Sequence, residues 1–206
     1  MRVTAETRAE TRERILEASR QLFAENGFDS ATTRDIARKA EIGVGTLFNY
    51  FSTKEAIVAT LAAEAVSATL LNFAHASSDA SSLEEELFAF IAATLRKLKP
   101  YRRPLTLVLE TELSPLAAGD NVEAKTMRVT HLEAVNQLCR RYNATDLTPV
   151  ALQIYWSLYV GLLAFWAKDG SPRQEDTLAL LDHSVEMFVA WLRSQSDLRR
   201  NQSKEN

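Results

Sequence analysis

The chain has 206 residues, of which 46% are hydrophobic and 25% charged, and its formal net charge at pH 7 is −3. This is the composition of a folded globular protein, and its single cysteine, Cys139, excludes an intrachain disulfide framework. The negative net charge excludes a global basic field, so nucleic acid could be bound only through a local patch. The N-terminal residues are charged and lack an apolar segment, so we expect no cleaved secretion signal and a cytoplasmic location.

Apolar residues recur at helical spacing through most of the chain, and no alternating strand pattern appears. This predicts an all-α fold, with an N-terminal helix-turn-helix domain over residues 1–54 and a C-terminal helical domain over 55–206. The predicted helices cover residues 7–26, 32–40, 44–50, 52–74, 82–99, 104–113, 121–143, 148–168 and 172–196.

Several of these helices have recognisable start and stop signals. Gly27 ends the first helix, and Thr32-x-x-Asp35 has the spacing of a capping box at the start of the second. Ser52 is the predicted N-cap of the fourth helix. Thr148-Pro149 and Ser171-Pro172 each place a capping residue before a proline at the first helical position. The polar residues from 198 onward are expected to fray.

Residues 32–51 have the dimensions of a helix-turn-helix, because two short helices are joined by the tight connection at residues 41–43. Arg34 and Lys54 are predicted in the first turns of their helices, where a cation is mildly unfavourable unless an external anion is bound there. A backbone phosphate is such an anion. On the short helix between them, Thr46, Asn49 and Tyr50 are expected to face outward, while Leu47 and Phe51 point inward.

The run Thr32-Thr33-Arg34-Asp35-Ile36-Ala37, followed by Gly45-Thr46-Leu47-Phe48-Asn49-Tyr50-Phe51-Ser52-Thr53-Lys54-Glu55-Ala56, resembles the DNA-binding domain of TetR-type transcriptional regulators. The resemblance covers about residues 10–60. It implies an all-helical homodimer that binds an operator in the major groove and holds an inducer pocket and dimer interface in its C-terminal helices. By position it implies phosphate contacts for Thr33, Arg34, Tyr50 and Lys54, and recognition-helix positions for Val44, Gly45, Thr46, Phe48 and Asn49.

Two positions depart from the usual pattern of that family. Glu41 stands where the turn commonly has glycine, and a left-handed conformation there costs about 1 kcal/mol. Gly43 stands where serine commonly precedes the recognition helix, so a hydroxyl cap is missing. These departures bear on DNA affinity and operator sequence and not on the fold.

Residues 150–167 form the most apolar stretch, which a hydropathy window would flag as a membrane span. We favour a helix buried on nearly all sides and expect no membrane association, because the flanks lack a basic cluster. In the last helix, two apolar stripes lie side by side, and one of them needs a partner, which predicts a homodimer. The predicted interface residues are Ser157, Gly161, Leu181, Val185, Phe188 and Leu192.

Aromatic residues of the C-terminal helices are either ordinary core residues or the walls of a pocket for an unknown effector, apolar or aromatic in character. The predicted pocket residues are Phe88, Tyr101, Glu110, His131, Tyr155, Trp156, Tyr159 and Phe165.

The sequence contains no nucleophile motif and no His pair at metal-ligand spacing, so we expect no enzyme, no metal site and no cofactor. Two functions remain. One is a sequence-specific transcriptional regulator, a ligand-released repressor that binds double-stranded DNA at a near-palindromic operator as a dimer. The other is a helical small-molecule sensor or carrier in which DNA binding is weakened or lost, an alternative that Glu41 supports.

Overall fold

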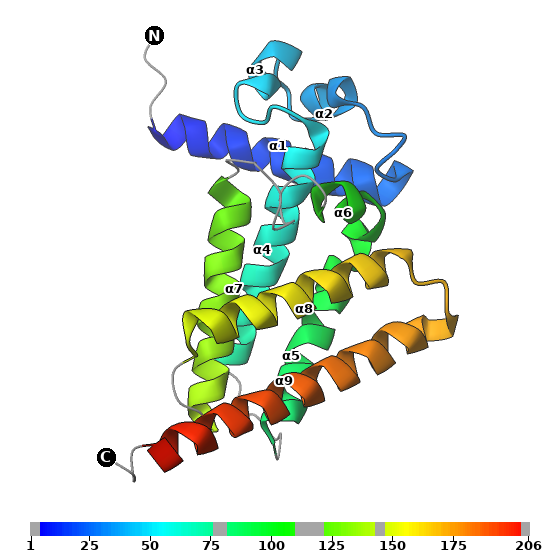
Figure 1. The fold of residues 1–206 in the computed structure, drawn as a ribbon. Helices are drawn as coiled ribbons and strands as arrows, with labels where there is room; N and C mark the ends of the chain where they lie inside the picture. The colour runs from blue at the N-terminus through cyan, green and yellow to red at the C-terminus, as the bar shows by residue number, and fades with distance from the viewer. Residues whose placement is uncertain (1–4, 76–81, 110–121, 143–146, 203–206) are drawn as a thin grey trace. The chain divides into compact units, whose positions relative to one another are not determined.

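A computed structural model describes residues 5–75, 82–109, 122–142 and 147–202, and every regular element within these ranges is a helix (Figure 1). The all-α prediction is therefore confirmed. The chain forms two compact units, one made of Met1–Glu64 with Lys99–Ala124 and the other of Ala65–Leu98 with Lys125–Asn206. The helices are α1 (Ala5–Asn26), α2 (Thr33–Lys39), α3 (Val44–Phe48), α4 (Lys54–His75), α5 (Leu83–Leu98), α6 (Arg102–Val108), α7 (Val122–Arg141), α8 (Pro149–Lys168) and α9 (Glu175–Gln202).

In the first unit, α1 provides the apolar face against which the short helices pack, with Ile15 and Leu16 fully buried. The helix ends as predicted at Gly27, which has a φ of 78° and donates from its N–H to the Phe23 carbonyl. Figure 1 shows α2 and α3 on the same side of α1. This is the arrangement of a helix-turn-helix supported by a preceding helix.

The predicted capping box of α2 is present. The backbone N–H of Asp35 donates to Thr32 Oγ1 at 3.1 Å, and the backbone N–H of Thr32 donates to the Asp35 carboxylate at 3.2 Å. The Thr32 hydroxyl also donates to the Asp35 carboxylate at 2.6 Å, and this bond, together with that from the Thr32 backbone N–H, lowers the pKa of the Asp35 carboxyl group below its usual value. The start of α2 is therefore fixed by two residues that lie three positions apart.

The turn between α2 and α3 depends on one residue in a left-handed conformation. Glu41 has a φ of 57°, so it does adopt the left-handed conformation, and the Ile42 N–H donates back to the Ala37 carbonyl at 3.0 Å. Gly43 is the N-cap of α3 and offers no side-chain bond, as expected. Leu47 and Phe51 are 0% and 4% exposed, so both point inward as predicted.

The predicted N-cap of α4 is wrong by one residue. Thr53, not Ser52, accepts the hydrogen bond from the Ala56 N–H, at 3.0 Å. The reason lies in the preceding helix, because the N–H of Phe51 still donates to the Leu47 carbonyl and the chain becomes free to start a new helix only after it. The following turns of α4 are tied to α1 by Arg20, which donates to Glu64 at 2.7 Å.

The helical segment that starts at Lys99, in the first unit, begins earlier than expected. The prediction treated residues 100–104 as a break, but Lys99–Tyr101 form a 3-10 turn and α6 begins at Arg102. Pro104 is tolerated there because the N–H groups of the first helical turn have no acceptor within the helix. The predicted end of this helix, near residue 113, lies outside the described residues.

In the second unit, α9 packs against α5 and α8. Thr148 caps α8 as predicted, accepting a hydrogen bond from the Ala151 N–H at 3.2 Å. Helix α8 has 20 residues and is apolar enough to cross a bilayer by length and composition. Within the chain only 39% of this stretch is buried, so the expected burial on nearly all sides is wrong: Trp156 and Trp166 are each 1% exposed, whereas Phe165 is 43% exposed.

The predicted start of the last helix at Pro172 is wrong. Residues Pro172–Gln174 form a 3-10 turn in which Arg173 and Gln174 have φ values of 51° and 63°, so α9 begins at Glu175. Asp169 sets this start, because its carboxylate accepts hydrogen bonds from the backbone N–H and the hydroxyl of Thr177. Those bonds lower the pKa of Asp169. At the other end, α9 continues to Gln202, through residues that the sequence predicts to fray.

Replacement of Glu41 by glycine tests the strain in the turn. We expect Glu41→Gly to raise the free energy of unfolding by about 0.5 to 1 kcal/mol, because relief of the left-handed conformation exceeds the added entropy of the unfolded chain. Urea unfolding of the full chain measures this. Glu41→Ala is the control for loss of the charge, and it should gain nothing. Equal stability of the two variants would show that the turn is unstrained.

Candidate functional site

Apart from Lys54, the residues predicted to contact DNA lie on α2, on α3 and directly after α3, where Thr33, Val44 and Tyr50 are half-buried and the others are exposed. Within α3, only Leu47 is buried, and its neighbours on both sides face solvent. Phe48 is 48% exposed although it is a large apolar residue. Arg34 is exposed in the first turn of α2. The surface thus presents hydroxyl, amide, aromatic and guanidinium groups, and its members are Thr33, Arg34, Val44, Gly45, Thr46, Phe48, Asn49 and Tyr50.

Lys54 has a role within the fold that the sequence does not reveal. Its ammonium group donates to the backbone carbonyls of Phe28 and Ala31 at 2.7 and 3.0 Å and lies 4.0 Å from the centre of the Phe28 ring. The residue therefore ties the start of α4 to the segment before α2. An ammonium group has three donors, so one N–H remains beyond these two bonds for a phosphate.

Arg8 is a candidate contact residue that the sequence reasoning missed. It is exposed near the start of α1, and its guanidinium carbon lies 5.9 Å from the centre of the Tyr50 ring. Tyr50 is itself a predicted phosphate contact, so Arg8 adds positive charge beside it. In the sequence, Arg8 is one basic residue among several charged residues, and this pattern does not indicate which helix Arg8 faces.

In the second unit, four of the predicted pocket residues form one buried aromatic cluster around His131. The rings of His131 and Tyr159 are stacked with centres 4.2 Å apart, and Trp156 lies edge-on at 6.1 Å. The His131 Nε2 atom is 3.0 Å from the Tyr155 hydroxyl oxygen. Each of these four residues is at most 3% exposed.

The cluster is electrically neutral. Burial lowers the pKa of His131 from 6.5 to about 3, because the imidazolium form would be removed from water without an opposite charge. Burial likewise raises the pKa of Tyr155 and of Tyr159 above the usual value for a phenol. The Nδ1 atom of His131 and the hydroxyl of Tyr159 are buried without a hydrogen-bond partner.

The other predicted pocket residues do not join this cluster through described contacts. Phe88 is half-buried on α5, and Phe165 is 43% exposed on α8. Tyr101 belongs to the first compact unit, where burial raises its pKa. Glu110 lies outside the described residues. The aromatic composition of the C-terminal helices thus identifies the centre of the cluster but not its extent.

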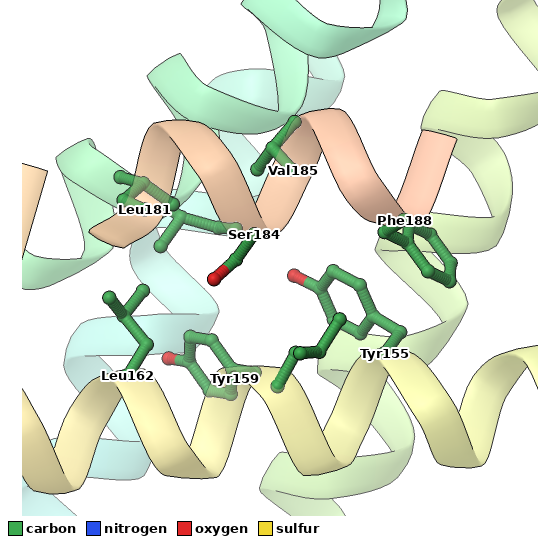
Figure 2. Close-up of a pocket in the computed structure, with 9 residues that line it drawn as sticks. Tyr155, Tyr159, Leu162, Leu181, Ser184, Val185 and Phe188 are labelled. Carbon is green, nitrogen blue, oxygen red and sulfur yellow. The ribbon is translucent and has the colours of Figure 1, made fainter. Parts of the chain in front are cut away.

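A small pocket lies between α8 and α9, with a cavity volume of about 20 Å³. Figure 2 shows its two walls, one formed by α8 and the other by α9. The lining residues are Ile91, Tyr155, Leu158, Tyr159, Leu162, Leu181, Ser184, Val185 and Phe188. Four of these residues belong to no predicted site: Ile91, Leu158, Leu162 and Ser184.

Three residues that the sequence assigned to the dimer interface are turned inward instead. Leu181, Val185 and Phe188 are 0%, 4% and 2% exposed within the single chain, and they line the pocket. A side chain that is buried within its own subunit cannot contact a second subunit, so these three residues do not form the interface in this structure. Leu192 is half-buried.

The second apolar stripe of α9 is the one that faces solvent. Leu180 and Met187 are 36% and 61% exposed, and Phe165 on α8 is exposed as well. Ser157 and Gly161, two of the predicted interface residues, are also exposed. We call the set of Ser157, Gly161, Phe165, Leu180 and Met187 the α8–α9 face.

One group of potential metal ligands lies on α9, formed by Asp182, His183 and Glu186, whose ligand atoms are within 4.8 Å of one another. All three residues are exposed, and His183 Nδ1 is 3.5 Å from the Glu186 carboxylate. Such spacing is that of an ordinary surface ion pair between adjacent helical turns.

In sequence, known proteins match this chain over its helix-turn-helix segment. Residues 15–61 match the family model described as bacterial regulatory proteins, tetR family. The HTH-type transcriptional regulator UidR of Escherichia coli K12 is 48% identical over 48 residues, which are 23% of this chain and 24% of that protein. The HTH-type transcriptional repressor KstR of Rhodococcus jostii is 35% identical over 63 residues, 30% of each chain. The aligned segments thus span about a quarter to a third of these relatives.

Solved structures match over most of the chain. The TetR-family repressor FadR of Thermus thermophilus, solved with lauroyl-CoA, has a TM-score of 0.66 at 19% identity and covers 86% of this chain and 93% of that one. A TetR regulator from Rhodococcus sp. RHA1 has a TM-score of 0.69 at 16% identity, covering 88% and 96%. At these identities the likeness shows the fold.

The segment at residues 15–61 is therefore similar in sequence to the helix-turn-helix of the tetR family of bacterial regulatory proteins, and the fold is similar to that of solved TetR-family regulators. The proteins that match are transcription regulators and not enzymes.

The buried His131 predicts a pH dependence of stability. In the unfolded chain it takes up a proton near pH 6.5, whereas the folded protein resists protonation down to about pH 3. The free energy of unfolding should therefore fall by up to about 1.4 kcal/mol per pH unit as the pH drops below 6.5. Urea unfolding at about pH 7 and about pH 5 should differ by about 2 kcal/mol more in the wild type than in His131→Gln.

His183→Gln is the matched control for this measurement. The His183 side chain is 75% exposed, so its removal should leave the difference between the two pH values unchanged. An equal pH dependence in His131→Gln and the wild type would show that His131 is protonated freely in the folded state.

Proposed function

We propose that this chain is a transcriptional repressor of the bacterial cytoplasm that binds a near-palindromic operator as a homodimer and leaves the DNA when a small effector binds. The observation that carries the proposal is the surface of α3 and its C-cap, where Thr46, Phe48 and Asn49 are exposed around the fully buried Leu47. A helix held in this way can enter the major groove with its exposed face toward the bases.

The groups on this surface suit two tasks. Thr46 and Asn49 are placed to form hydrogen bonds with base edges, and the exposed ring of Phe48 can contact thymine methyl groups. Arg34, in the first turn of α2, is placed to bind a phosphate together with the free backbone N–H groups of that turn. Phosphate contacts fix the register of the domain, and base contacts supply sequence preference.

A homodimer is supported by the α8–α9 face, which exposes large apolar residues on two adjacent helices. Met187 is 61% exposed and Phe165 43% exposed, while Ser157 and Gly161 leave room for a close approach of another helix. Two copies of this face would form a four-helix contact. A two-fold dimer places two recognition helices about 34 Å apart, or a multiple of this distance, which matches a palindromic site.

Release by an effector is supported by the buried aromatic cluster and the adjacent pocket of the second unit. Two fold neighbours were solved with acyl-CoA ligands, lauroyl-CoA in one and stearoyl-CoA in the other. An effector that binds better to a conformation with lower DNA affinity shifts the population away from the DNA-bound state. The coupling is reciprocal, so operator DNA would weaken effector binding by the same factor.

The alternative function, a sensor or carrier with weakened DNA binding, is favoured by Glu41 alone. Its carboxylate is exposed in the turn between α2 and α3, where it repels phosphate, and its left-handed φ of 57° adds strain. Selection of genomic duplex fragments by the purified protein at about 150 mM salt separates the two functions. Recovery of a palindrome supports the repressor, and recovery of nothing by a folded dimer supports the carrier.

Arg34 provides a test of phosphate binding. We expect Arg34→Ala to weaken binding to every duplex and to lower the slope of log affinity against log salt by about 1, because one released counterion is lost. Titration of a labelled duplex at several salt concentrations measures this. Lys168→Ala, which removes an exposed charge at the end of α8, is the control and should change neither quantity. An unchanged slope in Arg34→Ala would remove Arg34 from the phosphate contacts.

Asn49 provides the corresponding test of base readout. Asn49→Ala should change the sequence preference at one position of each half-site, at a cost of about 1 to 3 kcal/mol for the preferred base. Repetition of the duplex selection with the variant shows the new preference. The same palindrome bound with the same affinity would mean that Asn49 reads no base.

The α8–α9 face predicts how the dimer can be broken. Met187→Glu should weaken dimerisation at least tenfold, because a carboxylate would be buried without a partner. Sedimentation across a range of protein concentrations measures the dissociation constant. Leu71→Glu is the matched control, because Leu71 is 62% exposed but lies on α4. Equal effects of the two substitutions would contradict this choice of interface.

A further inference from the structure

Two basic residues in the helix-turn-helix part of the chain have no oxygen partner among the described residues. They are Arg8, near the start of α1, and Arg34, in the first turn of α2, and both are exposed. The other basic residues between positions 5 and 64 each pair with a carboxylate or donate to another oxygen of the chain: Arg12, Arg14, Arg20, Arg38, Lys39 and Lys54. Arg34 is already a proposed phosphate contact, so Arg8 is the cation that still needs an explanation.

Arg8 lies on the side of α1 that faces the other helices of this unit. Arg8, Arg12, Ile15 and Ser19 follow one another at intervals of four, three and four residues, which places them on one side of a helix. Ile15 and Ser19 are fully buried, Arg12 is half-buried, and Arg8 is exposed where this stripe leaves the core. There its guanidinium carbon lies 5.9 Å from the centre of the Tyr50 ring. The helical geometry therefore directs Arg8 toward the segment that follows α3.

The acidic residues of α1 do not neutralise Arg8. They follow the same intervals on the opposite side of the helix, where all of them are exposed: Glu6, Glu10, Glu13 and Glu17. Glu6 and Glu10 lie two positions before and after Arg8, a separation at which helical side chains do not face each other. The positive charge of Arg8 therefore remains on the side of Tyr50.

Within the free protein, this charge is mildly unfavourable. Arg8 and Arg12 carry like charges four positions apart, which destabilises a helix. Arg12 is compensated, because its guanidinium lies 3.9 Å from the Glu64 carboxylate and 5.4 Å from the centre of the Phe51 ring. Among the described residues, Arg8 contacts only the Tyr50 ring. An anion from outside the chain would offset the repulsion and accept hydrogen bonds from the unused guanidinium donors.

We propose that Arg8 and Tyr50 together bind one backbone phosphate of DNA, so that the start of α1 belongs to the DNA-binding surface. The guanidinium has several N–H donors and the phenol has one O–H donor, so both groups can bind the same phosphate. Tyr50 directly follows the exposed Asn49, which places this phosphate beside the proposed base contacts. The proposal rests on the DNA binding proposed above, and it adds a contact outside residues 15–61, the segment that the family model matches.

Arg8 and Arg34 are placed to bind different phosphates. In Figure 1, α1 begins on one side of α3, and α2 lies on the other side. A helix in the major groove has one DNA strand on each side, so groups on its two sides meet different strands. The losses of affinity caused by removing the two arginines should therefore add up.

Titration of a labelled, mixed-sequence duplex of about 30 base pairs, from about 50 to about 250 mM salt, tests the contact on the full chain. Phosphate contacts carry no sequence information, so the operator is not needed. We expect Arg8→Ala to weaken binding and to lower the slope of log affinity against log salt by about 1, because one counterion fewer is released. The double variant with Arg34→Ala should lower the slope by about 2. A double variant with the slope of Arg34→Ala alone would overturn the proposal.

The shared phosphate is tested by a double-mutant cycle with Tyr50. Tyr50→Phe should weaken duplex binding less in the Arg8→Ala background than in the wild type, because the two side chains bind one phosphate. Equal losses in both backgrounds would show that Arg8 and Tyr50 act at separate places, against the proposal.

Two variants separate phosphate binding from a structural role. Arg8→Lys keeps the charge and should keep the salt slope. Arg12→Ala, on the same side of α1, should lower the melting temperature of the free protein, because the contacts with Glu64 and Phe51 are lost. Arg8→Ala should leave that temperature unchanged or raise it. A lower melting temperature with an unchanged slope in Arg8→Ala would make Arg8 a structural residue and refute the proposal.

The same titrations distinguish this proposal from the proposed function. Duplex binding that depends on Arg34 but not on Arg8 overturns the contact at α1 and leaves the repressor intact. Dependence on both arginines in a chain that selects no palindrome supports the contact and counts against the repressor. A wild-type chain that binds no duplex at about 50 mM salt overturns both.

Discussion

The position of the candidate DNA-contacting groups depends on the burial of one side chain, Leu47. Helix α3 has five residues, which is too short for stability in isolation. Leu47 is fully buried, its N–H donates to the Gly43 carbonyl, and its own carbonyl accepts from the N–H groups of Tyr50 and Phe51. Leu47 thus takes part in hydrogen bonds at both ends of the helix. Because its side chain faces the core, the helical geometry turns the neighbouring Thr46 and Phe48 toward solvent.

A helix cap could be predicted correctly where one short segment contains all the atoms that form it. The capping box of α2 needs only Thr32, Asp35 and the backbone between them, so the spacing in the sequence is sufficient. The cap of α4 could not be predicted in this way, because Ser52 and Thr53 are equivalent as caps and the choice depends on where the preceding helix ends. The proline signal placed the start of α9 three residues too early, because the side chains of Ser171 and Asp169 accept from the N–H groups of Asp176 and Thr177 and not from those of the turn at Pro172.

The candidate sites, too, could be predicted only where they depend on a short segment of the sequence. The helix-turn-helix residues follow from a motif, and the structure places them on one surface. In the last helix the sequence shows two apolar stripes but not which of them the core receives, and the prediction chose the stripe of Leu181 as the interface. The structure buries Leu181, Val185 and Phe188 of that stripe and exposes Leu180 and Met187 instead, because the contacts with α5 and α8 decide which side of α9 faces the core.

The hydrogen bonds of Asp169 also restrict how far α8 and α9 can move apart. Asp169 follows the last turn of α8 and holds the first turn of α9 through Thr177, so the two helices are clasped at this end. Leu162 and Leu181 lie nearer the clasp, and Tyr155 and Phe188 lie farther along the pair, as Figure 2 shows. The bonds of Asp169 therefore oppose separation of α8 and α9 most strongly at the end near Leu181 and least at the end near Phe188.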